Sequence, residues 1–189
     1  VILNPGGGSI ESFIIVNASK NIKFSNLLIK NSFSNYALIN IQNSAPMFIE
    51  NVDIINNHTY ICGPFNYYYS SLDTGSDDQL FMTNVRIEKN VSLENNGAGC
   101  IGSGGGGAIL TNVVFKENQA NDYPGLTISG NTKLHNVKFI NNTLLSDETI
   151  WSSAFSLQIA YNSHTVLEKA FFTGNGGGIK INGGHPNYN

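Results

Sequence analysis

Charged side chains are scarce in this chain of 189 residues, at 12% of the total, and Arg86 is the single arginine. The 10 basic and 13 acidic groups give a formal net charge of −3, which leaves no basic stripe to neutralise phosphates. We therefore expect no nucleic-acid partner. No apolar run approaches the roughly 20 residues that a membrane-spanning helix needs, so we expect no membrane span in this segment.

Helix signals are missing as well. No segment has apolar residues recurring at spacings of three and four, which is the stripe of a helix packed on a core. The chain opens at Val1 without an initiator Met or a signal peptide and stops at Asn189 among polar residues. We expect a mature product or an excised fragment, with one domain over residues 1–189.

Uncharged polar residues take the place of the missing charges, together with 20 glycines. Apolar residues still make up 41% of the chain, enough for a continuous core. Hydrogen-bonding side chains can stack on copies of themselves, whereas stacked like charges repel. The composition therefore favours repeated strands held in register.

A repeat runs through most of the chain: Asn, apolar, any residue, apolar, and then a second Asn. The copies start at Asn26, Asn51, Asn84, Asn112 and Asn136, in steps of 25, 33, 28 and 24 residues. Steps of unequal length predict loops of different size between constant strands. The sequence thus predicts an all-β solenoid, a single right-handed parallel β-helix of the pectin-lyase-like type with roughly seven coils.

Each copy alternates apolar and polar residues, which is typical of a strand with one buried face. Such a strand shelters its apolar face only by stacking on its neighbours. The residues expected in this repeat core are Val52, Ile54, Val85, Ile87, Val113, Phe115, Val137, Phe139 and Phe172.

The asparagine after each strand is expected at a bend of the backbone. Asparagine tolerates the left-handed conformation that such bends require. Its amide can also bond to the asparagine one coil above and below. We therefore predict an asparagine ladder, with no catalytic role for these residues.

The second half of the chain resembles the polymorphic outer-membrane protein repeats of chlamydiae and related secreted proteins of protists. Those repeats pair a Gly-Gly-Ala-Ile element, here residues 106–109, with a Phe-X-X-Asn element, here residues 115–118, 139–142 and 172–175. Residues 177–179 look like another Gly-Gly start. The match covers roughly residues 104–183 and implies a right-handed β-helix, surface exposure and adhesion.

Cys62 and Cys100 are the only cysteines. Each follows a repeat strand, in consecutive coils, so a disulfide between them is predicted, with two unrelated thiols as the alternative. A bridge would suit an oxidising compartment.

Residues 60–80 form the longest insertion between repeats, which we interpret as an aromatic loop. Its rings could stack on sugars or form a protein interface, or they could cover the side of the solenoid. The candidate contact residues are Tyr60, Phe65, Tyr67, Tyr68 and Tyr69.

Asp73, Asp77 and Asp78 lie in the same insertion, where acidic loops can hold calcium. Their spacing does not match an EF-hand, so we interpret them as a solvated turn and expect no metal or other cofactor. Four sites fit the N-glycosylation pattern, and they favour a secreted or cell-surface protein. These sites are Asn17, Asn57, Asn90 and Asn141.

An enzyme is not expected, because polysaccharide hydrolysis needs two converging carboxylates and the one adjacent pair lies in a loop. The leading hypothesis is an extracellular structural or adhesive protein, which could be a subunit of a fibre or surface layer. Its expected partners are other copies of itself or neighbouring domains. The alternatives are a carbohydrate-active enzyme of the lyase or hydrolase kind and a glycan-binding module.

Overall fold

The computed structural model describes residues 2–3, 12–17, 20–69, 79–94, 97–103, 107–145, 155–160 and 163–182. Every regular element in this part of the chain is a β-strand, and the strands pair in parallel. They form three sheets, called A, B and C below. The prediction of an all-β chain with parallel strands is confirmed.

The three sheets differ in size, and sheet B is built from the shortest strands. Sheet A contains β1 (Ile2–Leu3), β3 (Ile22–Lys30), β6 (Met47–Ile55), β9 (Gln79–Glu88), β12 (Gly107–Thr111), β13 (Val114–Lys116), β16 (Asn131–His135), β17 (Lys138–Ile140), β20 (Thr165–Glu168) and β21 (Phe171–Thr173). Sheet B contains β4 (Phe33–Ser34), β7 (His58–Thr59), β10 (Val91–Ser92), β14 (Gln119–Ala120) and β18 (Thr143–Leu144). Sheet C contains β2 (Ile14–Asn17), β5 (Ile39–Gln42), β8 (Phe65–Tyr69), β11 (Gly99–Ser103), β15 (Leu126–Ile128), β19 (Phe155–Ile159) and β22 (Gly177–Ile181).

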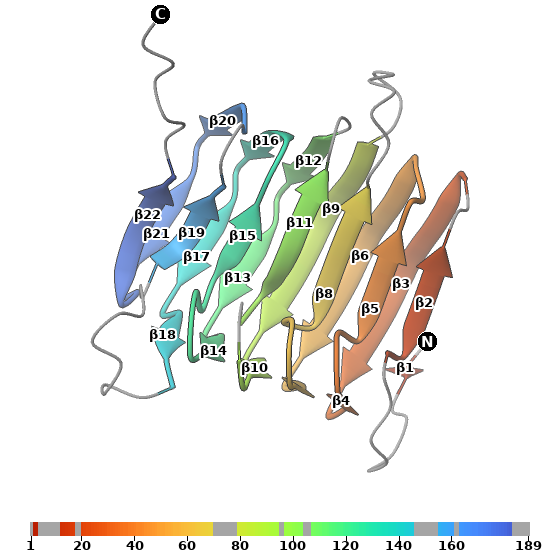
Figure 1. Ribbon diagram of the computed structural model, residues 1–189, viewed down its shortest axis with the longest axis horizontal. Helices are drawn as coiled ribbons and strands as arrows, with labels where there is room; N and C mark the ends of the chain where they lie inside the picture. The colour runs from red at the N-terminus through yellow and green to blue at the C-terminus, as the bar shows by residue number, and fades with distance from the viewer. Residues whose placement is uncertain are drawn as a thin grey trace, which may run out of the picture.

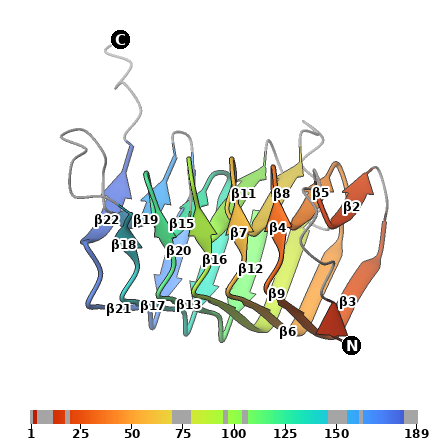
Figure 2. The same ribbon diagram turned by 90° about the horizontal axis from the view of Figure 1, so that it is seen from below.

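The chain visits sheets A, B and C in the same order from β3 to β19. One such passage is called a layer here. Successive layers follow one another from the N-terminal end to the C-terminal end of the molecule, with sheet C in front of sheet A in Figure 1 and the short strands of sheet B along the lower side. The view from below in Figure 2 shows sheets A and C facing each other across the interior.

The predicted core residues line up in columns across the layers. Val52 pairs with Val85, and Phe115 pairs with Phe139. The Phe115 and Phe139 rings stack with centroids 5.0 Å apart, and Phe172 continues the stack at 4.8 Å. All nine predicted core residues are fully buried except Phe172, which is partly exposed because it belongs to the last described layer.

The first asparagine of each repeat occupies a bend of sheet A in the left-handed conformation, with φ between 52° and 55°. From the second copy onward, the amide nitrogen donates to the amide oxygen of the asparagine one layer earlier, as from Asn84 to Asn51 at 3.1 Å. This exposed ladder consists of Asn26, Asn51, Asn84, Asn112 and Asn136.

The second asparagine forms a separate ladder inside the molecule. Asn90 illustrates its geometry: Nδ2 donates to Oδ1 of Asn118 at 3.0 Å and to the carbonyl of Ile54 at 2.9 Å. Oδ1 of Asn90 accepts from both the backbone N–H and Nδ2 of Asn57. All four hydrogen-bonding positions of the side-chain amide are therefore used. The buried ladder consists of Asn57, Asn90, Asn118, Asn142 and Asn175.

The stacked Phe column and the buried asparagine ladder explain why Phe and Asn recur together in the Phe-X-X-Asn element. Its Phe belongs to the stacked column and its Asn belongs to the buried ladder, so both residues contact equivalent residues in the next layer. A buried amide without partners costs about 1–3 kcal/mol of folding free energy. A change of register would therefore destabilise the fold at every layer. The predicted asparagine ladder is confirmed, and it is doubled. The left-handed conformation expected for the asparagine after each strand is wrong for the buried ladder, because it falls on the preceding residue, as at Lys89 before Asn90 and Glu117 before Asn118.

Two details differ from the sequence interpretation. Within the predicted insertion 60–80, residues 65–69 form strand β8, because Phe65 and Tyr67 alternate inward like other core residues. The second Gly-Gly element, Gly177-Gly178, lies in β22 of sheet C, whereas Gly107 lies in β12 of sheet A. A Cβ at Gly107 would lie 1.9 Å from the Asn131 carbonyl oxygen, so this glycine allows close approach of layers.

An isosteric exchange tests the buried ladder. Asn118→Asp at neutral pH removes the donors to Ile87 and Asn142 and buries a carboxylate. We expect it to lower the free energy of unfolding by about 3 kcal/mol or more in urea denaturation. Burial raises the pKa of the introduced carboxyl, so the loss should be smallest below about pH 4 and grow as the pH rises.

The matched control is Asn112→Asp in the exposed ladder, where water can replace the lost partner and aspartate tolerates the same backbone conformation. Its expected effect is within about 0.5 kcal/mol. Equal losses for the two variants would contradict a special role of the buried ladder.

Candidate contact surface and thiol cluster

The predicted aromatic contact surface is divided by strand β8. Phe65 and Tyr67 point inward and are fully buried, so they are core residues, and their assignment to a contact surface is wrong. Tyr68, on the outer face of the same strand, is 53% exposed, and Tyr60 before the strand is 46% exposed. The side chain of Tyr69 lies outside the described residues.

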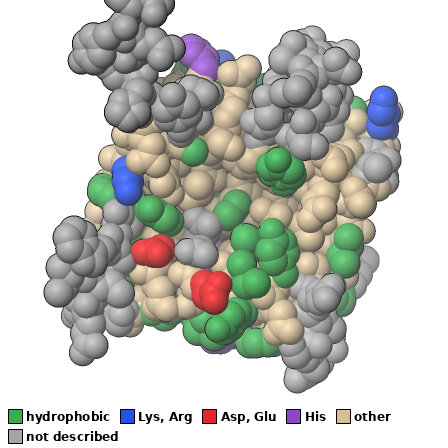
Figure 3. Space-filling model, in the orientation of Figure 1, with side chains coloured by type: hydrophobic (Ala, Val, Ile, Leu, Met, Phe, Trp, Pro, Cys, Tyr) green, Lys and Arg blue, Asp and Glu red, His purple; other side chains and the backbone are tan. Residues whose placement is uncertain are grey.

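The outer face of sheet C carries few charged side chains, as Figure 3 shows for the orientation of Figure 1. Its outward positions form a polar row across the layers, in which Asn40, Asn66, Cys100, Thr127 and Gln158 are paired in succession. Nδ2 of Asn66 donates to Oδ1 of Asn40 at 3.0 Å. This row is the uncharged polar stack that the composition predicts.

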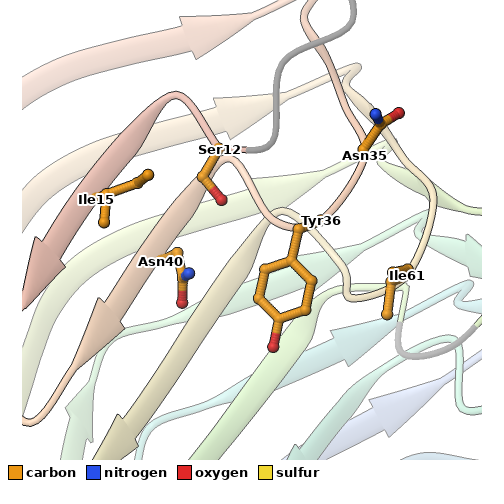
Figure 4. A pocket seen from close by; sticks show the side chains of 6 residues that line it. All are labelled: Ser12, Ile15, Asn35, Tyr36, Asn40 and Ile61. Carbon is orange, nitrogen blue, oxygen red and sulfur yellow. The ribbon is translucent and has the colours of Figure 1, made fainter.

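A pocket of about 320 Å³ opens at the N-terminal end of this face. Ile15 and Asn40 lie on one side of the Tyr36 ring and Ile61 lies on the other (Figure 4). None of the described residues that line the pocket is charged, and Ile15 is 61% exposed. The described lining residues are Ser12, Ile15, Asn35, Tyr36, Asn40 and Ile61.

Cys62 and Cys100 lie side by side without forming the predicted disulfide. Cys62 belongs to the loop between β7 and β8, and Cys100 projects from the next strand of sheet C, β11. The two thiols are hydrogen bonded to each other, and Cys62 is also hydrogen bonded to Tyr36. Consecutive layers thus bring the two cysteines together as predicted, but the predicted disulfide between them is not formed.

The cluster alters the acidity of its members. Hydrogen bonds from Cys100 and from Tyr36 lower the pKa of Cys62 to about 7, against the opposing effect of burial. The bond to Cys62 and burial raise the pKa of Cys100 well above its ordinary range. Burial and the neighbouring Cys62 raise the pKa of Tyr36 to about 12. The more exposed thiol is therefore also the more acidic one.

The outer face of sheet A carries ion pairs between consecutive layers. Arg86 forms a two-pronged pair with Asp53 at 2.9 and 3.1 Å, and these hydrogen bonds raise the pKa of Arg86. Glu88 is nearly buried and lies 3.2 Å from Lys116. Because these side chains have opposite charges in successive layers, they attract each other, whereas stacked like charges would repel.

The four glycosylation sequons fall into two groups. Asn57 and Asn90 are completely buried, and both side-chain amides are held by the buried ladder, so the folded chain has no room for a glycan there. Predicted glycosylation at these two sites is corrected accordingly. Asn17 and Asn141 are exposed, and their glycosylation remains a prediction.

Asp73, Asp77 and Asp78 lie outside the described residues. Within the described part of the chain, no group of three or more His, Cys, Asp or Glu side chains is placed to hold a metal ion. The same part contains no helix long and apolar enough to cross a membrane.

Tyr36, Ile15 and Ile61 were not singled out from the sequence. The sequence signal for Tyr36 is an aromatic residue in the polar segment between β4 and β5, where Tyr123 has the corresponding position before β15. Its position over the thiols could not be read from the sequence, because it depends on the stacking of three layers.

Comparison of the chain with protein-family models, with curated proteins and with solved structures found no match. The resemblance to the chlamydial repeats therefore remains a prediction based on short motifs.

Expression in a eukaryotic secretory host tests the division of the sequons. We expect the folded secreted protein to carry glycans at Asn17 and Asn141 and none at Asn57 or Asn90, because a glycan there removes ladder bonds before folding is complete. Glycopeptide mass spectrometry of the secreted fraction measures occupancy. A folded product with a glycan at Asn57 or Asn90 would contradict the buried ladder.

Proposed function

We propose that this chain is part of a right-handed parallel β-helix with about seven coils and that it acts as an extracellular structural or adhesive element. Five complete passages through sheets A, B and C, with a partial passage at each end of the described chain, support this number of coils. The exposed sequons Asn17 and Asn141 and the low charge favour a secreted or cell-surface location.

The observation that carries this proposal is the exposed apolar surface of the last described layer. Ile181 continues the inward column of Ile159 yet is 70% exposed, and Ile179 continues that of Leu157 and is 38% exposed. In the layers before, the same columns are buried. A surface with this pattern is complementary to one more layer of the same kind.

Two occupants suit this surface, a neighbouring domain or a second copy of this chain, and we propose the second copy. Strands in consecutive layers are parallel, so a copy that continues the stack joins head to tail. A head-to-tail contact does not close on itself unless the rotation makes a ring, and it therefore generates filaments. This geometry supports a fibre or surface layer better than a closed dimer.

Negative-stain microscopy and sedimentation test the assembly. We expect the wild-type chain to form elongated particles whose length grows with protein concentration. Ile181→Glu should weaken association by at least about tenfold, because the contact would bury an unpaired carboxylate.

The matched control is Tyr68→Glu, which places the same charge at a similarly exposed apolar residue in the middle of sheet C. It should leave the assembly unchanged. Short monodisperse rods of the wild type at every concentration would contradict self-association, and a loss of assembly in the control alone would point to side-to-side packing.

A glycan-binding module is the second candidate, supported by the exposed rings of Tyr60 and Tyr68 beside an uncharged polar face. Aromatic faces flanked by amides and hydroxyls suit neutral sugars. In this case Tyr68→Ala would abolish binding on a glycan array, whereas it would not alter end-to-end assembly.

A further inference from the structure

The thiol pair combines three features that are not needed for stacking layers. Cys62 and Cys100 are hydrogen bonded to each other without a covalent bond, across consecutive layers. A tyrosine hydroxyl, that of Tyr36, contacts Cys62 from the layer before. Asn66, which pairs with Cys100 in sheet C, donates to the same hydroxyl at 3.4 Å and so holds it in place.

The pocket reaches this cluster directly. Tyr36 lines the pocket and touches Cys62, and Ile61, on the other side of the ring, is the chain neighbour of Cys62 (Figure 4). Cys62 is therefore separated from the pocket by residues that it touches, Tyr36 through its hydroxyl and Ile61 through the chain. The uncharged lining suits a neutral molecule with both apolar and hydroxyl groups.

We propose that Cys62 and Cys100 form a thiol–disulfide exchange site that accepts small neutral organic disulfides through this pocket. Cys62 is the attacking residue, because it contacts Tyr36 and follows Ile61, both of which line the pocket, and Cys100, one layer further on, is the resolving residue. The inference does not depend on the assembly or on the extracellular role proposed above.

The reaction balances without any further reactant. The Cys62 thiolate attacks one sulfur of the external disulfide, which forms a mixed disulfide and releases one small thiolate. The Cys100 sulfur, once deprotonated, attacks Cys62, forms the Cys62–Cys100 bond and releases the second small thiolate. Two electrons pass from the protein dithiol to the external disulfide, and the two thiol protons end on the two small thiols.

The electrostatics of the cluster suit this order of events. A pKa of about 7 leaves roughly half of Cys62 as thiolate at neutral pH, compared with about 1% for a thiol at the ordinary value of 9.0. Lower basicity also reduces nucleophilicity, so the net gain in rate is about fivefold. The charged and titratable groups around Cys62 are Cys100, Tyr36 and Glu94, of which only Glu94 opposes the thiolate by its charge.

The product would link two consecutive layers covalently. Cys62 precedes β8 and Cys100 lies in β11, the next strand of sheet C. A bridge over a loop of this length is expected to raise Tm by about 10 °C in a chain of this size.

The test uses the reduced full chain with 2-hydroxyethyl disulfide as the probe, followed by alkylation and intact mass spectrometry. We expect both thiols to disappear together, with an intramolecular bond and no retained probe. The rate should level off above about pH 7–8, following Cys62. A wild-type chain that keeps both thiols, retains the probe or dimerises through disulfides would overturn the proposal, as would a rate still rising tenfold per pH unit at pH 9.

Three variants assign the roles. Cys100→Ser should stop at a mixed disulfide on Cys62, and Cys62→Ser should react at least about fivefold more slowly than wild type. Tyr36→Phe should shift the pH profile upward while the exchange still runs to completion, a change that a structural role alone does not produce. Urea denaturation checks that each variant is folded.

Ile15→Glu tests the pocket, since this exposed side chain can change without disturbing the core. It should slow a negatively charged disulfide such as oxidised glutathione more than the neutral probe. Equal rates of adduct formation in Cys62→Ser and wild type would show that Cys100 attacks the probe first and would reverse the assignment. Equal slowing of both probes by Ile15→Glu would remove the pocket from the proposal.

Discussion

The buried asparagine ladder is the interaction on which the rest of this structure depends. The amides of Asn90, Asn118 and Asn142 each use both hydrogens and accept two hydrogen bonds, and every one of these bonds joins different layers. A slip by one residue would leave several buried polar groups unpaired at once. The apolar columns, by contrast, would tolerate small shifts, because dispersion has little directionality. The hydrogen bonds of the buried amides therefore fix the register of the layers, and the burial of apolar side chains supplies the driving force for folding.

The outer faces are organised by the same register but with different chemistry. Sheet A places Asp53 beside Arg86 and Glu88 beside Lys116, whereas sheet C carries an uncharged polar row. Alignment of equivalent positions is thus a constraint on every surface residue, since each one meets its counterpart in the next layer. It also explains how two cysteines separated by a long stretch of sequence become neighbours.

Much of the fold could be predicted from the sequence because the repeat itself encodes it. The alternation around Val52 and Val85 and the recurring asparagines directly indicate inward columns and bends. The interpretation failed where one residue type has two uses. Asn57 and Asn90 fit a glycosylation pattern and a ladder equally well, and only burial decides between them. Phe65 and Tyr67 lie in β8 of sheet C, which contains Asn66 but not the repeat pattern with two asparagines, so the pattern does not reveal them as core residues. The bonding state of Cys62 and Cys100 and the position of Tyr36 depend on side-chain directions that no repeat encodes.

The spacing between repeats varies while the register does not, and this makes the molecule modular. Thr83 and Thr111 occupy equivalent positions in neighbouring layers, each directly before an asparagine of the exposed ladder. Removing residues 84–111 would join Thr83 to Asn112 and would place Asn112 over Asn51. Because strands pair only between adjacent layers, such an excision shortens the stack by one unit and keeps the remaining strand interfaces equivalent. Unequal recombination between repeats would then change the length of this protein without creating a new fold.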